Sequence, residues 1–352
     1  MEFGISVATS TNSWEVVKRA EELGFSHAWF YDTQLLCADV YAVMALAAQN
    51  TSKIKLGTGV AIPSNRISAV TASAFGTLNE LAPGRIIFGV GTGFTGRRTM
   101  GMNAIKLKDM EGYVDEVYGL LAGDTVETVI EGQTRKIRLL NPEAGLINTK
   151  DPIELHMSAM GPNARKTCAR MKAGYINFFA DTDMANADLG KMRDEWTAAG
   201  NTGDFHSTAL TLGRVLEDGE PHDSEKSMAQ AGTVVSVAFH NFVEMEERGS
   251  LFPMDPQLAG TLEEYKKIYQ KYQPADAKYL DLHEGHMIYL RDDEKHLITG
   301  ELIKNMTFTG TVSELCDRVA AVRDGGYDQF AVQIVQGHED AIEDWAKVMK
   351  AM

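Results

Sequence analysis

The chain has 352 residues, of which 44% are apolar and 24% are charged, and these are the proportions of an ordinary globular protein. Its 34 basic and 49 acidic residues give a formal net charge of −15, which disfavours nucleic acids and anionic membranes as partners. Any bound phosphate must therefore be held by a local site.

The cysteines and the first residues predict the compartment. Cys37, Cys168 and Cys316 are widely spaced and odd in number, which is typical of buried free thiols and not of a disulfide scaffold or a zinc cluster. The N-terminal segment lacks a basic region followed by an apolar stretch, and no uncharged apolar run is long enough to cross a membrane. We expect a soluble, cytoplasmic protein with no membrane partner.

Short β-rich runs alternate along the chain with longer helical patterns, as repeated βα units require. The expected strands are residues 3–8, 27–31, 54–60, 85–90, 153–157, 175–179, 209–215 and 329–335. Helical periodicity over residues 12–23 and 312–323 ends at Gly24 and at Gly325–Gly326, as helices commonly end at glycine. These units predict a (β/α)₈ TIM barrel, although the pattern leaves an open doubly wound sheet as an alternative.

Two longer intervals, at about 92–151 and 216–305, interrupt the regular spacing of strands. The first predicts a helix over 106–121 and a hairpin over 125–140 that turns at residues 131–133. The second carries helical patterns around 234–243 and 261–272. Neither interval has the features of a separate domain, so we expect one domain over 1–352 with insertions in the βα loops, where substrates are selected.

The most informative segment, residues 54–101, contains two apolar strands that each end in a Gly-Thr-Gly turn, at 57–59 and 91–93. Bare backbone at a strand end lets a flat polar ligand approach without meeting side chains. These paired turns resemble those of the bacterial-luciferase-like family. That family includes FMN-dependent monooxygenases and methylenetetrahydromethanopterin-reductase-like enzymes that use the 5-deazaflavin coenzyme F420.

The resemblance implies where a flavin would bind. It implies a non-prolyl cis peptide at Gly59–Val60, against which the central flavin ring is supported, and it places Thr92 of the second turn at the cofactor. An ordinary strand end before a proline-restricted turn is the alternative at Gly59–Val60. No Gly-x-Gly-x-x-Gly follows the first strand, which argues against a nicotinamide-binding Rossmann unit.

A phosphate site is expected after the fifth strand, in the turn Ser158, Ala159, Met160 and Gly161. Pro162 then opens a helix predicted over 163–172, whose free amide groups and dipole favour an anion. Arg165 or Lys166 could add charge from the first turn, or could be solvated. A plain strand-to-helix connection is the other interpretation of this turn.

Asp32 and His286 are the candidate catalytic residues. By resemblance, Asp32 faces the flavin or the substrate, but Thr33 stands where several deazaflavin enzymes have histidine; a solvated or capping carboxylate is the alternative. His283 and His286 are three residues apart around a glycine, which does not fit a zinc-binding helix, so we expect no metal. Either histidine could act as an acid or base, or could be an exposed loop residue.

Arg97, Arg98 and Phe94 follow the second glycine turn and are candidates for substrate binding. Arginine can hold a carboxylate or sulfonate with its forked donors, although surface ion pairs explain the two arginines equally well. Phe94 lies late enough in the turn to touch substrate, with core packing as the alternative.

Together these features predict a flavin-dependent oxidoreductase, first of all a two-component monooxygenase. In that function a separate flavin reductase supplies reduced FMN, and dioxygen is used to oxygenate a small organic substrate. The alternatives are an F420-dependent hydride-transfer reductase or dehydrogenase and a non-catalytic flavin-binding protein. We also expect a homodimer.

Overall fold

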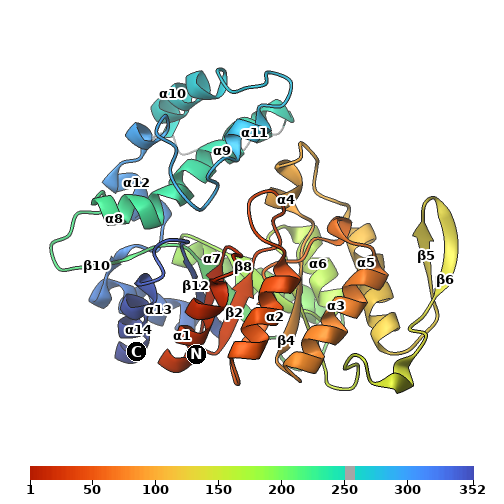
Figure 1. Ribbon diagram of the computed structural model, residues 1–352. Helices are drawn as coiled ribbons and strands as arrows, with labels where there is room; N and C mark the ends of the chain where they lie inside the picture. Colours follow the sequence, from red (N-terminus) through yellow and green to blue (C-terminus); the bar gives the residue numbers. More distant parts are fainter. Residues whose placement is uncertain (250–257) are drawn as a thin grey trace.

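Eight parallel strands close into a barrel in the computed structural model, which describes residues 1–249 and 258–352 (Figure 1). The strand order around the barrel is β1-β12-β9-β8-β7-β4-β3-β2, and β1 pairs in parallel with both β2 and β12. This closure confirms the (β/α)₈ barrel and excludes the open sheet. The strands are β1 (Glu2–Val7), β2 (His27–Phe30), β3 (Lys55–Thr58), β4 (Ile86–Val90), β7 (Glu154–Ser158), β8 (Gly174–Phe178), β9 (Ser207–Thr211) and β12 (Gln329–Ile334).

Helices surround the barrel and bury their apolar faces against the strands. They are α1 (Ser13–Leu23), α2 (Val40–Asn50), α3 (Ser68–Leu81), α5 (Leu107–Leu121), α6 (Pro162–Arg170), α7 (Thr182–Ala198), α13 (Val312–Gly325) and α14 (Ala341–Ala351). The glycine signals are confirmed: α1 ends at Gly24 with φ 102°, and α13 ends at Gly326 with φ 97°. Thr311 and Glu314 form a capping box at the start of α13.

Side chains alternate between two apolar cores because successive residues of a strand point to opposite faces. The larger core lies between strands and helices, and a smaller one fills the barrel around Trp29, whose indole Nε1 donates to Gln329 Oε1 at 2.9 Å. A Cβ on Gly57 would lie 2.7 Å from the Trp29 ring, and one on Gly59 would lie 2.9 Å from its Cβ. These two glycines are therefore required by packing inside the barrel.

The insertion at 216–305 forms a helical layer above the end of the barrel that carries α4 (Figure 1). It enters and leaves through a short parallel pair, β10 (Val215–Leu216) and β11 (Gly310–Thr311). Its elements are α8 (Glu225–Ser227), the π-turn η3 (Met228–Gly232), α9 (Thr233–Glu247), α10 (Ala259–Tyr269), α11 (Tyr279–Leu282), η5 (Lys295–Leu297) and α12 (Gly300–Met306). These helices bury a separate apolar cluster that includes Phe239, Tyr265 and Ile303. Both helical patterns expected here are confirmed.

The interval 92–151 divides between the two ends of the barrel. Helix α4 (Phe94–Arg98) lies in the loop that follows β4, whereas the predicted hairpin, β5 (Val126–Ile130) and β6 (Gln133–Ile137), follows the crossover helix α5. Short 3₁₀ turns lie at η1 (Pro63–Asn65) and η2 (Pro142–Ala144). The hairpin thus lies in an αβ connection, which corrects its expected place in a βα loop: the crossover helix is complete before the hairpin begins. Within the described residues, no helix combines the length and apolarity needed to span a bilayer.

Replacing Gly89 by alanine tests the packing of the barrel. A Cβ at this position would lie 1.9 Å from the carbonyl oxygen of Thr58, so we expect the free energy of unfolding to fall by about 2 to 3 kcal/mol. Gly190 is the matched control, since it lies in α7 with open space at its Cβ position, and its alanine variant should be neutral or up to about 1 kcal/mol more stable. Urea denaturation measures both, and similar stabilities for the two variants would contradict the expectation.

Candidate active site

The inward-facing residues at the carboxyl ends of the strands form the floor of the barrel mouth. Ser6 Oγ and Tyr31 OH lie 3.1 Å apart, and Gln333 is the register partner of Ser6 across β1 and β12. Ser6 and Gln333 occupy strand positions that alternate with apolar residues of the outer core, and Tyr31 directly follows β2. Sequence reasoning missed them, although the alternation of Gly4 and Ser6 with Ile5 and Val7 carried the signal.

The ends of β3, β4 and β7 meet on one side of this mouth. The peptide bond Gly59–Val60 is cis, as the resemblance implied. A Cβ on Gly91 would lie 2.6 Å from Val60 Cγ2 and 3.8 Å from Ser158 Cβ, so these three residues adjoin one another. Thr92 is half-buried, and its carbonyl accepts a hydrogen bond from Ile105 N at 3.0 Å. A Cβ on Gly59, in contrast, would point toward Trp29 inside the barrel.

The turn after β7 leads directly into α6, with Gly161 at the N-cap and Pro162 in the first turn. No side chain caps the amino end of α6, and open space surrounds the position of a Cβ on Gly161. The first amide groups of α6 are therefore available to an anion. Ala159 is buried, whereas Met160 is exposed.

Arg165 supports this turn from within the fold. Its side chain is buried, Nη1 donates to the carbonyl of Met160, and the guanidinium lies 3.7 Å from Asp188. Its Nε has no hydrogen-bond partner, whereas Lys166 is exposed. Arg165 thus fixes the carbonyl of Met160 just before α6, and its charge is partly balanced by Asp188.

Asp32 is buried, and both of its carboxylate oxygens have partners. Its Oδ2 accepts from the backbone of Ile62 at 3.0 Å, and Arg66 Nη1 pairs with its Oδ1 at 3.0 Å. Arg66 also reaches Asp39 at 2.5 Å and lies over the ring of Tyr41. These contacts hold the segment after the cis peptide in place, which favours a positioning role; a catalytic role for Asp32 stays a prediction.

The two arginines after the second glycine turn differ in environment. Arg98 is buried and pairs with Glu244 of α9 at 2.8 Å, while its guanidinium also covers the half-exposed ring of Phe94 at 3.5 Å. Arg97 donates to Ser64 Oγ and to the carbonyl of Asn103, both at 2.5 Å. Arg98 thus joins α4 to the insertion, and its charge is already paired. Substrate binding by either arginine stays a prediction.

His283 and His286 are buried, so the interpretation of both as exposed loop residues is wrong. The insertion folds their segment against α9: His283 Nε2 lies 3.2 Å from Glu244 Oε1, and the Nδ1 atoms of the two histidines are 3.4 Å apart. Burial, with the neighbouring His283 and His240, holds the pKa of His286 well below its usual range. The imidazole of His286 is therefore neutral near pH 7, with its Nε2 unpartnered.

This histidine segment touches the barrel mouth directly. Gln333 Nε2 donates to the carbonyl of Met287 at 3.0 Å, which leaves the buried Gln333 Oε1 without a partner. The insertion consequently covers the mouth on the side of β12, and His286 is adjacent in sequence to the contact. Its role as an acid or base stays a prediction.

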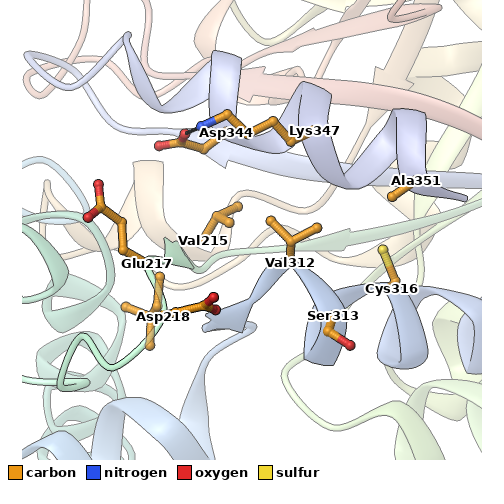
Figure 2. A pocket seen from close by; sticks show the side chains of 10 residues that line it. Val215, Glu217, Asp218, Val312, Ser313, Cys316, Asp344, Lys347 and Ala351 are labelled. Atoms are coloured by element: carbon orange, nitrogen blue, oxygen red, sulfur yellow. Dashed lines mark hydrogen bonds and ion pairs between the residues drawn. The ribbon is translucent and has the colours of Figure 1, made fainter.

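A separate cavity of about 730 Å³ lies on the outer wall of the barrel, between the β10–β11 pair and helices α13 and α14 (Figure 2). Val215, Val312, Cys316 and the ion pair Asp344–Lys347 line it. None of the predicted site residues contributes to it. The polar groups gathered at the strand ends make the mouth the candidate site.

Replacing Arg98 by glutamine should loosen the contact between α4 and the insertion. The substitution leaves the buried Glu244 carboxylate without its nearest cation, with only Arg248 at 3.9 Å, and we expect a loss of about 3 kcal/mol in unfolding free energy. Arg97→Gln is the matched control and should change stability by less than about 1 kcal/mol. Hydrogen exchange of α9, together with urea denaturation, would report the effect; equal losses in the two variants would refute the assigned difference.

Comparison with known proteins agrees with this architecture. A family model described as luciferase-like monooxygenase matches residues 6–329. A 5,10-methylenetetrahydromethanopterin reductase of Methanolobus tindarius is 32% identical over 181 residues, which are 50% of this chain and 53% of that protein. Limonene 1,2-monooxygenase of Rhodococcus erythropolis is 28% identical over 192 residues, 53% of this chain and 48% of that protein.

A solved structure supports the fold over its full length. The F420-dependent tetrahydromethanopterin reductase of Methanopyrus kandleri superimposes with a TM-score of 0.68 at 22% identity, covering 99% of both chains. The chain spans about half the length of the curated relatives it matches. The family match over most of the sequence and the closed barrel lead to one conclusion: the chain belongs to the luciferase-like monooxygenase family, whose members include flavin- and F420-dependent oxidoreductases.

Proposed function

We propose that the chain is an oxidoreductase that binds coenzyme F420 across the barrel mouth and uses it to transfer hydride to or from a small organic substrate. The observation that carries the proposal is the uncapped amino end of α6 beside the polar residues of the mouth. A flavin-type coenzyme has a phosphate at one end of its ribityl chain and a flat ring at the other. The amino end of α6 and the polar residues of the mouth are the two places that we assign to these two chemical features.

The phosphate end is served by α6. The free amide groups of its first turn and the positive end of its dipole attract an anion, and the buried Arg165 holds the carbonyl of Met160 in the turn before them. This is the local attraction that a chain of net charge −15 needs to hold a phosphate. Ser158 adds a hydroxyl at the start of the same turn.

The ring end is served by the mouth. Val60 and Gly91 offer a flat, largely apolar support beside the hydroxyl of Ser158. The unpartnered Gln333 Oε1 is a buried acceptor that a ring or substrate N–H or O–H would satisfy. When bound, F420 would donate the hydride in its reduced form or accept it in its oxidised form, and the chain positions the substrate and excludes water beneath the insertion.

F420 is favoured over FMN by the relatives. The methylenetetrahydromethanopterin reductase is the more similar of the two curated relatives, and a solved enzyme of that class is described as F420-dependent. This order reverses the expectation from the sequence, in which an FMN monooxygenase came first.

The FMN monooxygenase is the second candidate, favoured by the family description and by the limonene monooxygenase. Only the monooxygenase function requires a separate flavin reductase as a partner. A homodimer is part of both proposals.

Anaerobic titration of the purified protein with F420 and with FMN, each oxidised and reduced, followed by addition of substrate and then admission of oxygen, tests the proposal. We expect tighter binding of F420, followed by its reduction or oxidation with a suitable small alcohol or reducible substrate and no oxygen uptake. Binding of reduced FMN alone, with oxygen consumption that depends on an organic substrate, would replace it with the monooxygenase. Binding without turnover of any substrate would favour the non-catalytic alternative.

Gly161→Asp tests the phosphate site separately. Aspartate is a favourable N-cap residue and open space is available, so stability should be unchanged or slightly higher. Its carboxylate would occupy the anion site and repel the phosphate of the coenzyme. We therefore expect coenzyme affinity to fall at least about tenfold. Gly161→Asn, which caps without charge, should lose less. Equal affinities for the wild type and Gly161→Asp would rule out this phosphate position.

A further inference from the structure

The amino-terminal end of the barrel, opposite the candidate active site, is unusually rich in histidine. His27 opens β2, His206 directly precedes β9, and His156 lies inside β7. The ring centroids of His206 lie 5.7 Å from His27 and 5.1 Å from His156. None of these rings has a part in the proposed function.

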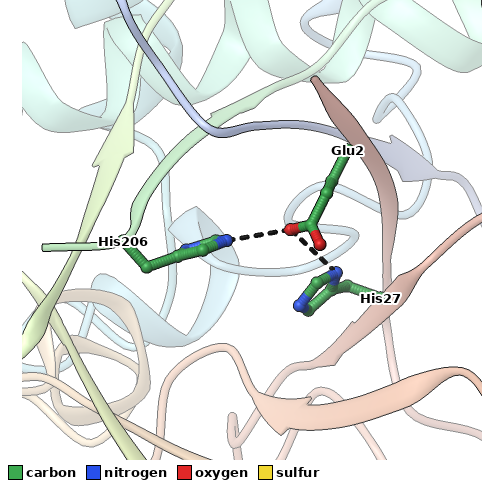
Figure 3. Close-up of side chains that lie close together, drawn as sticks. All are labelled: Glu2, His27 and His206. Carbon is green, nitrogen blue, oxygen red and sulfur yellow. Dashed lines mark hydrogen bonds and ion pairs between the residues drawn. The ribbon is translucent and has the colours of Figure 1, made fainter.

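Three side chains here converge on one point (Figure 3). Glu2 Oε2 lies 2.9 Å from His206 Nε2 and 3.8 Å from His27 Nδ1, and the three potential ligand atoms all lie within 4.8 Å of one another. The tetrahedral arrangement of nitrogen and oxygen around Zn²⁺, with bonds of about 2.0 to 2.1 Å, places ligands a little over 3 Å apart. Small side-chain rotations therefore bring the three atoms to this spacing.

The other nitrogen of each ring is free to carry the proton. His27 is 2% exposed and its Nε2 has no hydrogen-bond partner, and Nδ1 of His206 is also unpartnered. The Ser26 hydroxyl lies 2.8 Å from His27 Nδ1, but it also donates to the carbonyl of Phe3 at 2.9 Å and so does not require that nitrogen as an acceptor. A cation at Glu2 can thus take His27 Nδ1 and His206 Nε2 as neutral ligands.

We propose that Glu2, His27 and His206 form a site for Zn²⁺ at the amino-terminal end of the barrel. Two imidazole nitrogens and one carboxylate oxygen are a donor set that Zn²⁺ accepts readily, and the partly exposed Glu2 and His206 leave room for a water as fourth ligand. The ion links the first strand to β2 and to the segment before β9. It therefore has a structural role, distinct from coenzyme binding.

The expectation of no metal rested on the cysteine spacing and on the closely spaced pair His283 and His286. Positions 2, 27 and 206 have no spacing that a motif could reveal, and only closure of the barrel brings them together. The competing interpretation is a simple hydrogen bond between Glu2 and His206 without any ion.

The test uses the full chain without an added histidine tag, first stripped of metals with a chelator and then titrated with ZnCl₂ by calorimetry. We expect one Zn²⁺ per chain at micromolar affinity or better and a rise of several degrees in Tm. Glu2→Gln and His206→Ala should each weaken binding at least tenfold. His296→Ala removes an exposed histidine of the insertion and should bind as the wild type does.

Each outcome decides the proposal. Absence of saturable binding by the wild type, or unchanged affinity in Glu2→Gln, would overturn it and leave the Glu2–His206 hydrogen bond as the explanation. Glu2→Gln decides alone if His206→Ala does not fold, because the substitution keeps the shape of a half-exposed side chain. Titration with Co²⁺ provides a second readout, since an imidazole–carboxylate site should give visible absorption that both variants lose.

Discussion

The structure depends on how the barrel interior is filled around Trp29. An eight-stranded barrel encloses just enough space for layers of side chains, and one indole takes up much of the central layer. It can do so only because Gly57 and Gly59 lack side chains where the ring lies, and because Gly89 lets β4 approach Thr58 closely. This steric constraint sets the distances between β2, β3 and β4, and hence the shape of the mouth above them.

The same constraint explains why backbone and small groups dominate one side of the mouth. With bulky side chains excluded from the ends of β3 and β4, Val60, Gly91 and Ser158 are brought together. Asp32 then holds the segment that follows Val60 through the amide of Ile62 and through Arg66. A flat surface of backbone and small side chains suits a flat ring, because little has to move when the ring binds.

Electrostatic pairing fixes the insertion over the mouth. Arg98 and Glu244 are both buried, and each would be costly without the other. Burial by itself would raise the pKa of Glu244, but the hydrogen bond with His283 and the charge of Arg98 outweigh that effect, so the pKa is lowered and the carboxylate stays ionised near neutral pH. On the far side, Gln333 joins the insertion to β12. The cover of the candidate site is thus held by polar contacts at two edges.

The sequence by itself determined the eight strands, the two long intervals and the turn that begins α6, and it favoured a barrel over the open sheet that only closure of the strands excluded. These follow from local signals: apolar runs, helical periodicity and glycine at helix ends depend on the backbone and on near neighbours. The cis peptide followed from resemblance.

Only the tertiary structure decided which face each glycine presents, that Asp32 and Arg98 are already paired, and that His286 is buried. It also decided that Ser6, Tyr31 and Gln333 meet at the mouth and that Glu2, His27 and His206 meet at the opposite end. The physical reason is that burial and charge pairing are set by residues distant in the chain, which approach one another only when the barrel closes.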